Sequence, residues 1–311
     1  MKAKLFAVSF AFLAVFGFST GSISRADNIF VSNSGNNTIE EFDSSGVGVV
    51  FANSGLNDPQ GLAFDSQGNL YVANYGNNTI EEFNTNGVGT VFASTGLNEP
   101  GGLAFNSSGN LYVANSGNNT IEEFNTNGIA SVFASFGLSY PSGLAFDSSG
   151  NLYVASGYTI EEFNTNGVGT AFAGPIHDVS GYLGGATGLA FDSSGNLYVA
   201  VTGTINEHTL QPYPASIDVF NTNGVGTIFA SDFSNLTPHG VAFDSGGNLY
   251  VANSDNIEEY NTDGIGSVFA TTGLDDPAFI ATQIPEPSTW VLLAIGLIAL
   301  LIRPLLKRKR V

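Results

Sequence analysis

Residues 102–142 read GLAFNSSGNLYVANSGNNTIEEFNTNGIASVFASFGLSYPS, and nearly the same text recurs along most of the chain. Self-similarity with a period of about 40 residues is typical of solenoids and propellers, so it decides the fold before any local feature does. The asparagine that opens the second apolar run stands at Asn28, Asn69, Asn110, Asn151, Asn196 and Asn248. The first three intervals are 41 residues and the last two are 45 and 52, so the later units carry insertions.

Each unit contains four short apolar runs, which in the quoted stretch occupy 102–105, 110–114, 120–124 and 129–134. All have the length of a strand and are rich in aromatic and β-branched residues. Asn, Asp, Ser and Gly fill the connections, where Gly supplies positive φ and Asn or Asp tolerates it. The unit is therefore predicted to be a four-stranded antiparallel meander.

The two ends of the array are complementary. The first unit starts at its second strand (28–32), whereas 277–282 follow the sixth unit and align with the first strand of another unit at 59–64. Radial packing buries both faces of such sheets. We therefore predict an all-β, six-bladed β-propeller of four-stranded antiparallel blades over 27–283, with a three-plus-one closure in which the C-terminal strand is innermost in the N-terminal blade.

The consensus of the unit resembles a known repeat. P-x-G-[LV]-A-F-D-S-x-G-N-L-Y-V-A-N precedes a Gly/Asn loop and I-E-E-F-N-T-N-G, and the pattern extends over residues 28–282. It is similar to the NHL repeat and its relatives in the SMP-30/gluconolactonase and streptogramin-lyase superfamily. The resemblance implies a propeller, and because such propellers include lactonases, lyases and binding scaffolds, it leaves the activity open.

Comparison with that superfamily bears on one activity. Lactonases of the SMP-30 type hold a divalent metal at the channel mouth with acidic and Asn ligands. The corresponding positions here carry no carboxylate: Gln60, Gly101, Ser142, Thr187, His239 and Ala278. The resemblance thus implies that the lactonase metal site is absent.

Charge is unevenly distributed. Residues 27–284 contain 26 Asp and Glu but neither Lys nor Arg. Nucleic acid is excluded as a partner, because binding it requires cationic side chains that displace counterions from phosphates. The eight basic residues lie in the terminal segments: Lys2, Lys4, Arg25, Arg303, Lys307, Arg308, Lys309 and Arg310.

The first 26 residues have the pattern of a secretory signal peptide. Lys2 and Lys4 precede an apolar core at 5–18, and Ser24-Arg25-Ala26 forms a small-x-small cleavage site. We predict an N-terminal signal helix and cleavage after Ala26, which would export the protein.

Residues 284–311 closely resemble the PEP-CTERM sorting signal. The motif Pro285-Glu286-Pro287 precedes a predicted transmembrane helix at 289–306, and the basic end is expected in the cytoplasm. The resemblance implies recognition by exosortase, a membrane-embedded cysteine transpeptidase found in bacteria that make extracellular polysaccharide. The predicted sorting and processing residues are Pro285, Glu286, Pro287, Arg303, Lys307, Arg308, Lys309 and Arg310.

Two groups of acidic residues recur at fixed positions of the repeat. Asp in the Asp-Ser-x-Gly-Asn turns is expected to cap the turn, since Asn106 occupies the same position. Glu pairs in the third strands predict solvated outer strands, with weak Ca²⁺ sites as the alternative. The pairs are Glu40-Glu41, Glu81-Glu82, Glu122-Glu123, Glu161-Glu162 and Glu258-Glu259, and Asp218-Val219 interrupts the series in the fifth unit.

Three histidines fall on one predicted face of the ring. They define a candidate metal or acid/base site. The alternative is that they are unrelated surface residues. The candidates are His177, Asp178, Glu207, His208 and His239.

The sequence favours an exported, non-enzymatic propeller that acts at the cell surface or in an extracellular matrix or biofilm. Exosortase and the membrane are its expected partners during export, and extracellular polysaccharide or another surface protein is a possible partner afterwards. The alternative is a metal-dependent hydrolase or lyase that uses the histidine face. Neither interpretation names a cofactor beyond a divalent cation such as calcium.

Overall fold

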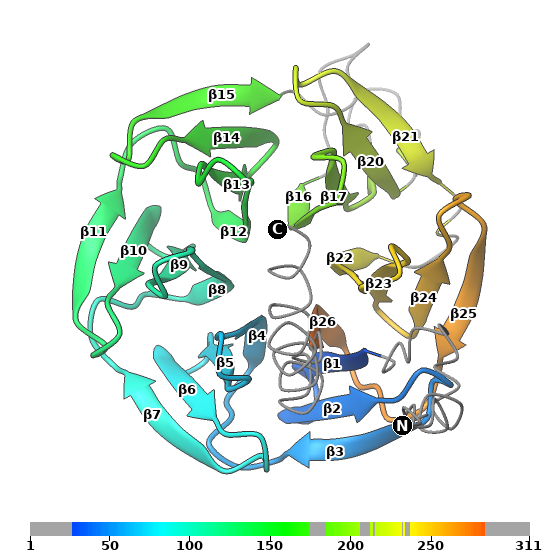
Figure 1. The fold of residues 1–311 in the computed structure, drawn as a ribbon, viewed down its shortest axis with the longest axis horizontal. Coiled ribbons are helices and arrows are strands. Elements are labelled where there is room, and N and C mark those ends of the chain that lie inside the picture. Colours follow the sequence, from blue (N-terminus) through cyan, green and yellow to red (C-terminus); the bar gives the residue numbers. More distant parts are fainter. Residues whose placement is uncertain are drawn as a thin grey trace, which may run out of the picture.

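The strands form six four-stranded antiparallel sheets arranged radially around one axis (Figure 1). The structure is a computed structural model that describes residues 27–173, 185–205, 212–213, 215–231, 233 and 237–283. The predicted six-bladed propeller is confirmed. The predicted signal and transmembrane helices lie outside these residues, and within them no helix is long and apolar enough to cross a membrane.

Blades are numbered along the chain, and their strands are given from the axis outward. Blade 1 comprises β26 (Pro277–Gln283), β1 (Asn28–Asn33), β2 (Thr38–Phe42) and β3 (Gly48–Ala52). Blade 2 comprises β4 (Pro59–Phe64), β5 (Leu70–Asn74), β6 (Thr79–Phe83) and β7 (Gly89–Ala93). Blade 3 comprises β8 (Pro100–Phe105), β9 (Leu111–Asn115), β10 (Thr120–Phe124) and β11 (Ala130–Ala134).

The second half of the ring has the same order and one insertion. Blade 4 comprises β12 (Pro141–Phe146), β13 (Leu152–Ser156), β14 (Thr159–Phe163) and β15 (Gly169–Ala173). Blade 5 comprises β16 (Ala186–Phe191), β17 (Leu197–Val201), β20 (Ser216–Phe220) and β21 (Gly226–Ala230), with the pair β18 (Thr204–Ile205) and β19 (Pro212–Tyr213) inserted. Blade 6 comprises β22 (Pro238–Phe243), β23 (Leu249–Asn253), β24 (Ile257–Tyr260) and β25 (Gly266–Ala270).

The ring closes by strand exchange between the two ends of the propeller. β26 pairs antiparallel with β1, with Ile29 opposite Thr282 and Val31 opposite Ile280. Sheet order is β26-β1-β2-β3, so the predicted three-plus-one closure is confirmed.

The hydrophobic core lies between neighbouring blades. Between blades 2 and 3, for example, Ile80 and Val113 are fully buried in one cluster. At the same junction the Tyr71 ring meets Phe92 and Phe105 edge-on, at centroid distances of 5.0 and 4.9 Å. Edge-to-face geometry is favourable for aromatic pairs. Because each interface is shared by two blades, no blade can bury its faces alone.

Glycine at the third position of the inner strands allows the blades to approach closely at the axis. A Cβ added to Gly102 would lie 2.1 Å from the Ser142 carbonyl oxygen of the next blade. This contact explains the Gly of the P-x-G motif.

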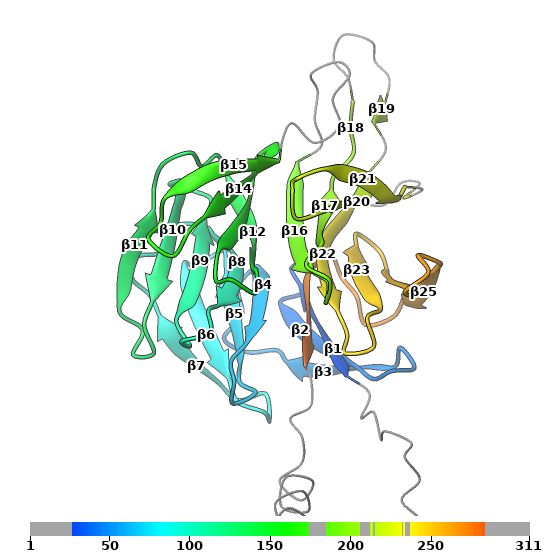
Figure 2. The ribbon, with the colours of Figure 1, turned by 45° about the horizontal axis from the view of Figure 1, so that its top comes forward.

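The two faces of the ring differ. We define the turn face by the turns that join first to second and third to fourth strands, such as 65–69. The loop face carries the other connections, including β18 and β19, which rise above blade 5 in Figure 2. Both ends of the propeller lie on the turn face, since Asp27 accepts a hydrogen bond from Ser245 N and Gln283 Nε2 donates to Gly68 O at 3.5 Å.

Candidate functional site

The innermost strands contribute one residue each near the axis, at their second position. Five of these residues are partly exposed between buried neighbours, and Ala278 is buried. They are the residues singled out by comparison with the lactonases: Gln60, Gly101, Ser142, Thr187, His239 and Ala278.

Hydroxyl groups near the axis bond the blades together. Ser142 Oγ donates to the carbonyl of Thr187 at 3.1 Å, and Thr187 Oγ1 donates to that of His239 at 3.0 Å. Ser32 Oγ donates to the carbonyl of Gln60 in blade 2 at 2.7 Å and accepts from Phe279 N of the closing strand at 3.0 Å. These hydroxyls are therefore part of the scaffold.

His239 is the one predicted site histidine within the described residues. It lies on β22, where burial lowers its pKa while Asp276 opposes that effect. The other candidates, His177, Asp178, Glu207 and His208, lie outside the described residues, so the predicted histidine site stays a prediction. In the part of the propeller that the structure describes, no three His, Asp or Glu side chains come together to form a metal site.

The Glu pairs were predicted to be solvated, and this prediction is wrong for three of their members. Third strands lie inside the outermost strands, and the first Glu of the pair is buried in blades 1 to 3, with 5–6% exposure for Glu40, Glu81 and Glu122. Burial disfavours the charged carboxylate and raises the pKa of all three. The prediction failed because the pattern of two adjacent acids does not reveal which loop covers the strand.

The second Glu of the pair is held by a neighbouring side chain. Tyr250 Oη donates to Glu259 Oε1 at 3.1 Å, and Tyr71, Tyr112 and Tyr153 bond the matching Glu in their own blades. Burial and this glutamate raise the pKa of Tyr112 to about 12. In blade 1, where Phe30 replaces the Tyr, Asn28 Nδ2 donates to Glu41 at 2.5 Å.

Asp in the repeated turns caps the turn, as predicted. Asp65 Oδ1 accepts from the backbone N–H of Gln67 and Asn69, and its Oδ2 accepts from Asn69 Nδ2 at 2.9 Å. Asn106 accepts in the same way from Ser108 N. The turn residues therefore use these oxygens locally.

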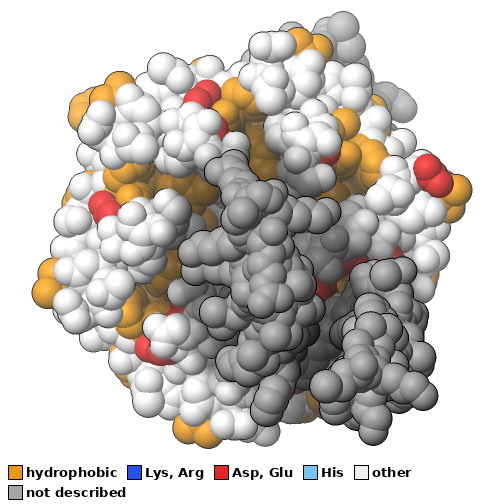
Figure 3. All heavy atoms as spheres, viewed as in Figure 1, with side chains coloured by type: hydrophobic (Ala, Val, Ile, Leu, Met, Phe, Trp, Pro, Cys, Tyr) orange, Lys and Arg blue, Asp and Glu red, His pale blue; other side chains and the backbone are white. Residues whose placement is uncertain are grey.

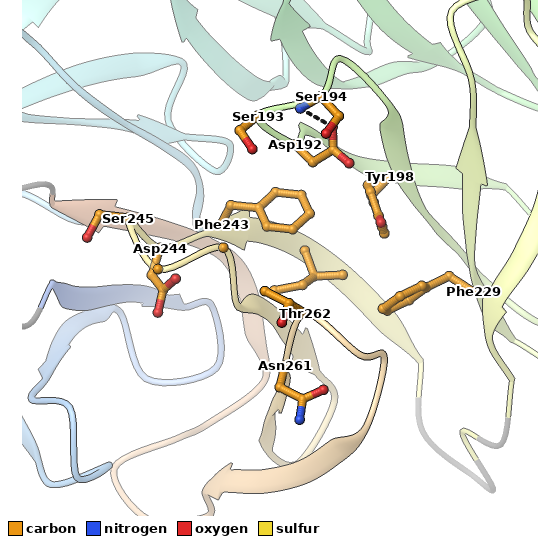
Figure 4. A pocket seen from close by; sticks show the side chains of 13 residues that line it. Asp192, Ser193, Ser194, Tyr198, Phe229, Phe243, Asp244, Ser245, Asn261 and Thr262 are labelled. Atoms are coloured by element: carbon orange, nitrogen blue, oxygen red, sulfur yellow. Dashed lines mark hydrogen bonds between the residues drawn. The ribbon is translucent and has the colours of Figure 1, made fainter.

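A pocket opens on the turn face between blades 5 and 6, with a volume of about 360 Å³ (Figure 4). Tyr198, Phe229 and Phe243 form its apolar wall, with Tyr198 ring centroids 5.1 Å from Phe229 and 5.0 Å from Phe243. Burial, and next the nearby Asp192, raise the pKa of Tyr198. Polar residues surround this wall: Asp192, Ser193, Ser194, Asp244, Ser245, Asn261 and Thr262. A pocket of about 500 Å³ occupies the matching place between blades 2 and 3.

Sequence reasoning missed this pocket. The signal was present, because Asp218-Val219 interrupts the Glu-Glu series and Val219 lies directly opposite Tyr198. Recognising its meaning required the register of β17 and β20, which the sequence does not give.

Three segments match the NHL repeat, at 56–83, 97–124 and 236–256, and residues 283–309 match the PEP-CTERM protein-sorting motif. The propeller therefore contains NHL repeats, and the chain continues from it into a PEP-CTERM sorting motif. The resemblance inferred from the sequence is thereby confirmed. The sorting motif of this NHL-repeat propeller implies export and membrane anchoring through the C-terminus. No curated protein has a sequence that matches the chain.

Solved structures share the fold of this NHL-repeat propeller at low identity. A chain of the nidogen/laminin complex is 19% identical, with a TM-score of 0.68 over 82% of this chain and 98% of that one. Catalytically inactive virginiamycin B lyase from Staphylococcus aureus with quinupristin is 16% identical, with a TM-score of 0.59 over 85% and 94%. A gluconolactonase from Xanthomonas campestris is 15% identical, with a TM-score of 0.55 over 78% and 79%. At these identities the similarity concerns the fold alone.

Proposed function

We propose that the protein is exported, recognised at its C-terminal tail by exosortase, and displayed at the cell surface as a non-enzymatic binding propeller. The observation that carries this proposal is the junction at residue 283, where closing strand β26 ends and the PEP-CTERM match begins. The sorting tail therefore continues directly from a structural strand of the propeller.

The position of this junction supports an orientation. Gln283 lies on the turn face, so a tail held by the membrane brings that face toward the membrane. The loop face, with β18 and β19, then points away from the cell.

Charge restricts the partner. All the charged side chains of the described propeller other than His are acidic, and Figure 3 shows carboxylates at several blade junctions on one face. An anionic polymer would be repelled at low ionic strength, whereas a neutral polysaccharide or a surface protein with basic residues would not.

Several residues that could suggest catalysis have structural roles instead. Ser142 and Thr187 use their hydroxyls between inner strands, and the turn Asp residues cap their own turns. This supports a scaffold that presents a binding surface.

Intact mass of the exported protein from the native host tests the proposal. We expect the mature wild-type protein to lack Val311, and the triple change of Pro285, Glu286 and Pro287 to Ala to leave full-length protein in the membrane. Proline disfavours helical backbone at its own position and at the preceding residue, so we expect loss of both prolines to block processing by a protease that requires an extended segment. Recovery of wild-type protein that still ends at Val311 would contradict sorting by exosortase.

The alternative function, a metal-dependent hydrolase or lyase, has one observation in its favour. His239 lies partly buried near the axis with a lowered pKa, so it is neutral and able to act as a base or ligand at pH 7. Metal analysis of the exported protein and of its His239→Ala variant decides between the two, since loss of bound metal in the variant would favour the enzyme.

A further inference from the structure

A structural pair that recurs around the ring is broken in blade 5. Four blades place a Tyr of the second strand directly opposite a Glu of the third, as with Tyr153 and Glu162. In blade 5 Val219 stands opposite Tyr198. No group among the described residues forms a hydrogen bond with the Tyr198 hydroxyl. The hydroxyl is therefore available to a ligand.

The Tyr198 side chain reaches into the pocket between blades 5 and 6. In Figure 4 it lies between Asp192 and Phe229, with Phe243 beside it. All three aromatic rings are partly buried and line one wall. The wall can thus contact the C–H groups of a ligand while the Tyr198 hydroxyl exchanges hydrogen bonds with its polar groups.

The rest of the lining is polar, and Asp192 and Asp244 are its charged members. Asp192 and Asp244 accept bonds from the Asn at the end of their own turns, at 2.8 Å from Asn196 Nδ2 and 2.8 Å from Asn248 Nδ2. Asn261 Oδ1 accepts from Asp263 N, which leaves its amide N–H groups for a ligand. Exposed hydroxyls of Ser193, Ser194 and Ser245 complete the rim.

We propose that this pocket binds a neutral sugar unit of an extracellular polysaccharide. A sugar ring combines C–H faces with many hydroxyls, which matches the aromatic wall and the polar rim. The volume of about 360 Å³ falls within the range of small-ligand sites. The pocket lacks Lys and Arg and contains two carboxylates, so acidic sugars are disfavoured. This inference rests on the proposed binding function and names its ligand class.

Restoring the repeated pair provides the sharpest test. Val219→Glu introduces the residue that other blades carry opposite the Tyr, so it should bond the Tyr198 hydroxyl and add a charge without disturbing the fold. Tyr198→Phe removes the hydroxyl alone. Tyr153→Phe is the matched control, because it removes the hydroxyl of an intact pair in blade 4.

Binding is measured on the exported protein by saturation-transfer NMR and then by titration. The probes are neutral tetrasaccharides of glucose, galactose and mannose, with tetragalacturonate as the acidic counterpart. We expect a neutral tetrasaccharide to bind and tetragalacturonate not to bind. Val219→Glu should weaken binding at least tenfold, and Tyr198→Phe roughly two- to tenfold, as loss of one hydrogen bond predicts. Tyr153→Phe should bind like the wild type, and all three variants should melt within a few degrees of it.

Saturation transfer to none of the neutral tetrasaccharides would overturn the proposal, as would unchanged affinity in folded Val219→Glu. Equal binding of tetragalacturonate would overturn the charge argument and with it the ligand class. These outcomes do not depend on the proposed sorting. A protein that is exported and processed at its tail but binds no sugar would refute the sugar-binding proposal and leave the sorting proposal intact.

Discussion

Individual buried side chains make the stability of the fold depend on pH, and most of them are carboxylates without cationic neighbours. Glu40, Glu81 and Glu122 have pKa values raised by burial, so the folded protein binds more protons than the unfolded chain. Their destabilisation is present at neutral pH and is relieved as pH falls through the raised values toward about 4.3. His239 acts in the opposite sense, because its lowered pKa costs stability as pH falls below about 6.5.

The first prediction concerns Glu81. The change Glu81→Gln removes a buried charge, so the melting temperature should rise at pH 8. The difference from wild type should shrink as pH falls and vanish only well below about pH 4.3, where Glu81 is protonated in both folded and unfolded chains. Asp263→Asn, in an exposed turn where other blades carry Asn, removes the same charge without burial and serves as control. An equal rise in both variants would show that overall repulsion, not burial, is responsible.

The second prediction concerns a buried asparagine. Asn115 is fully buried, and its side chain accepts from Asn98 N at 3.1 Å and donates to Gly96 O at 2.9 Å, which holds the link before blade 3. Asn115→Ala should lower the free energy of unfolding by about 1–3 kcal/mol, because those backbone groups lose their partner. The exposed Asn127→Ala should change it by less than about 0.5 kcal/mol in the same denaturant titration.

The inner strands lie so close to one another that they tolerate little additional side-chain volume. The third prediction compares two adjacent glycines of β8. Gly102→Ala should destabilise the protein by about 1–3 kcal/mol or more, since its Cβ would meet the Ser142 carbonyl oxygen at 2.1 Å. Gly101→Ala should be nearly neutral, since the nearest atom to its Cβ is 3.8 Å away. Similar denaturation midpoints for both variants would contradict the close approach of the inner strands.

For the outer strands, the sequence predicts some structural features and not others. The repeat pattern predicts that these strands exist and where they come in each blade. However, β7 carries a bulge, because Ile80 pairs with Ala93 while Glu81 pairs with Val91. In this outermost strand Val91 is 59% exposed, although its β-branched residues would also suit a buried strand. Bulges twist an edge and hinder pairing with other chains, an effect that residue patterns alone do not indicate.

In the whole molecule, ring closure could be predicted because the first repeat lacks its first strand and an unpaired first strand follows the sixth repeat. The candidate site could not be predicted in this way. The pocket at Tyr198 depends on which residues face each other across β17 and β20 and on how blades 5 and 6 pack. The histidine hypothesis drew on long insertions, where the repeat no longer specifies the backbone, and four of its five residues lie outside the described part of the chain.

The fourth prediction concerns closure. A chain of residues 27–276 lacks β26, which uncovers the edge of β1 and its unpaired backbone groups. Compared with residues 27–283, it should aggregate and lose cooperative melting. A monomer with an unchanged melting temperature, seen by light scattering and calorimetry, would contradict the role of the closing strand.

The fifth prediction concerns the summed charge. If Ca²⁺ bridges carboxylates, millimolar CaCl₂ should raise the melting temperature of residues 27–283 more than NaCl of equal ionic strength. Equal shifts would mean that screening alone acts and would remove the cation-site alternative.

The strand that closes the ring is also the strand to which the sorting tail is attached, and this makes the closure a mechanical connection. β26 runs along the depth of the ring in Figure 2, so tension from the tail pulls along the strand. Antiparallel hydrogen bonds lie perpendicular to the strands, so such a pull shears the five residue pairs between β1 and β26 together and does not peel them one by one. Drag on a surface-held propeller would therefore be resisted by the whole seam, and a force large enough to break the attachment would open the ring.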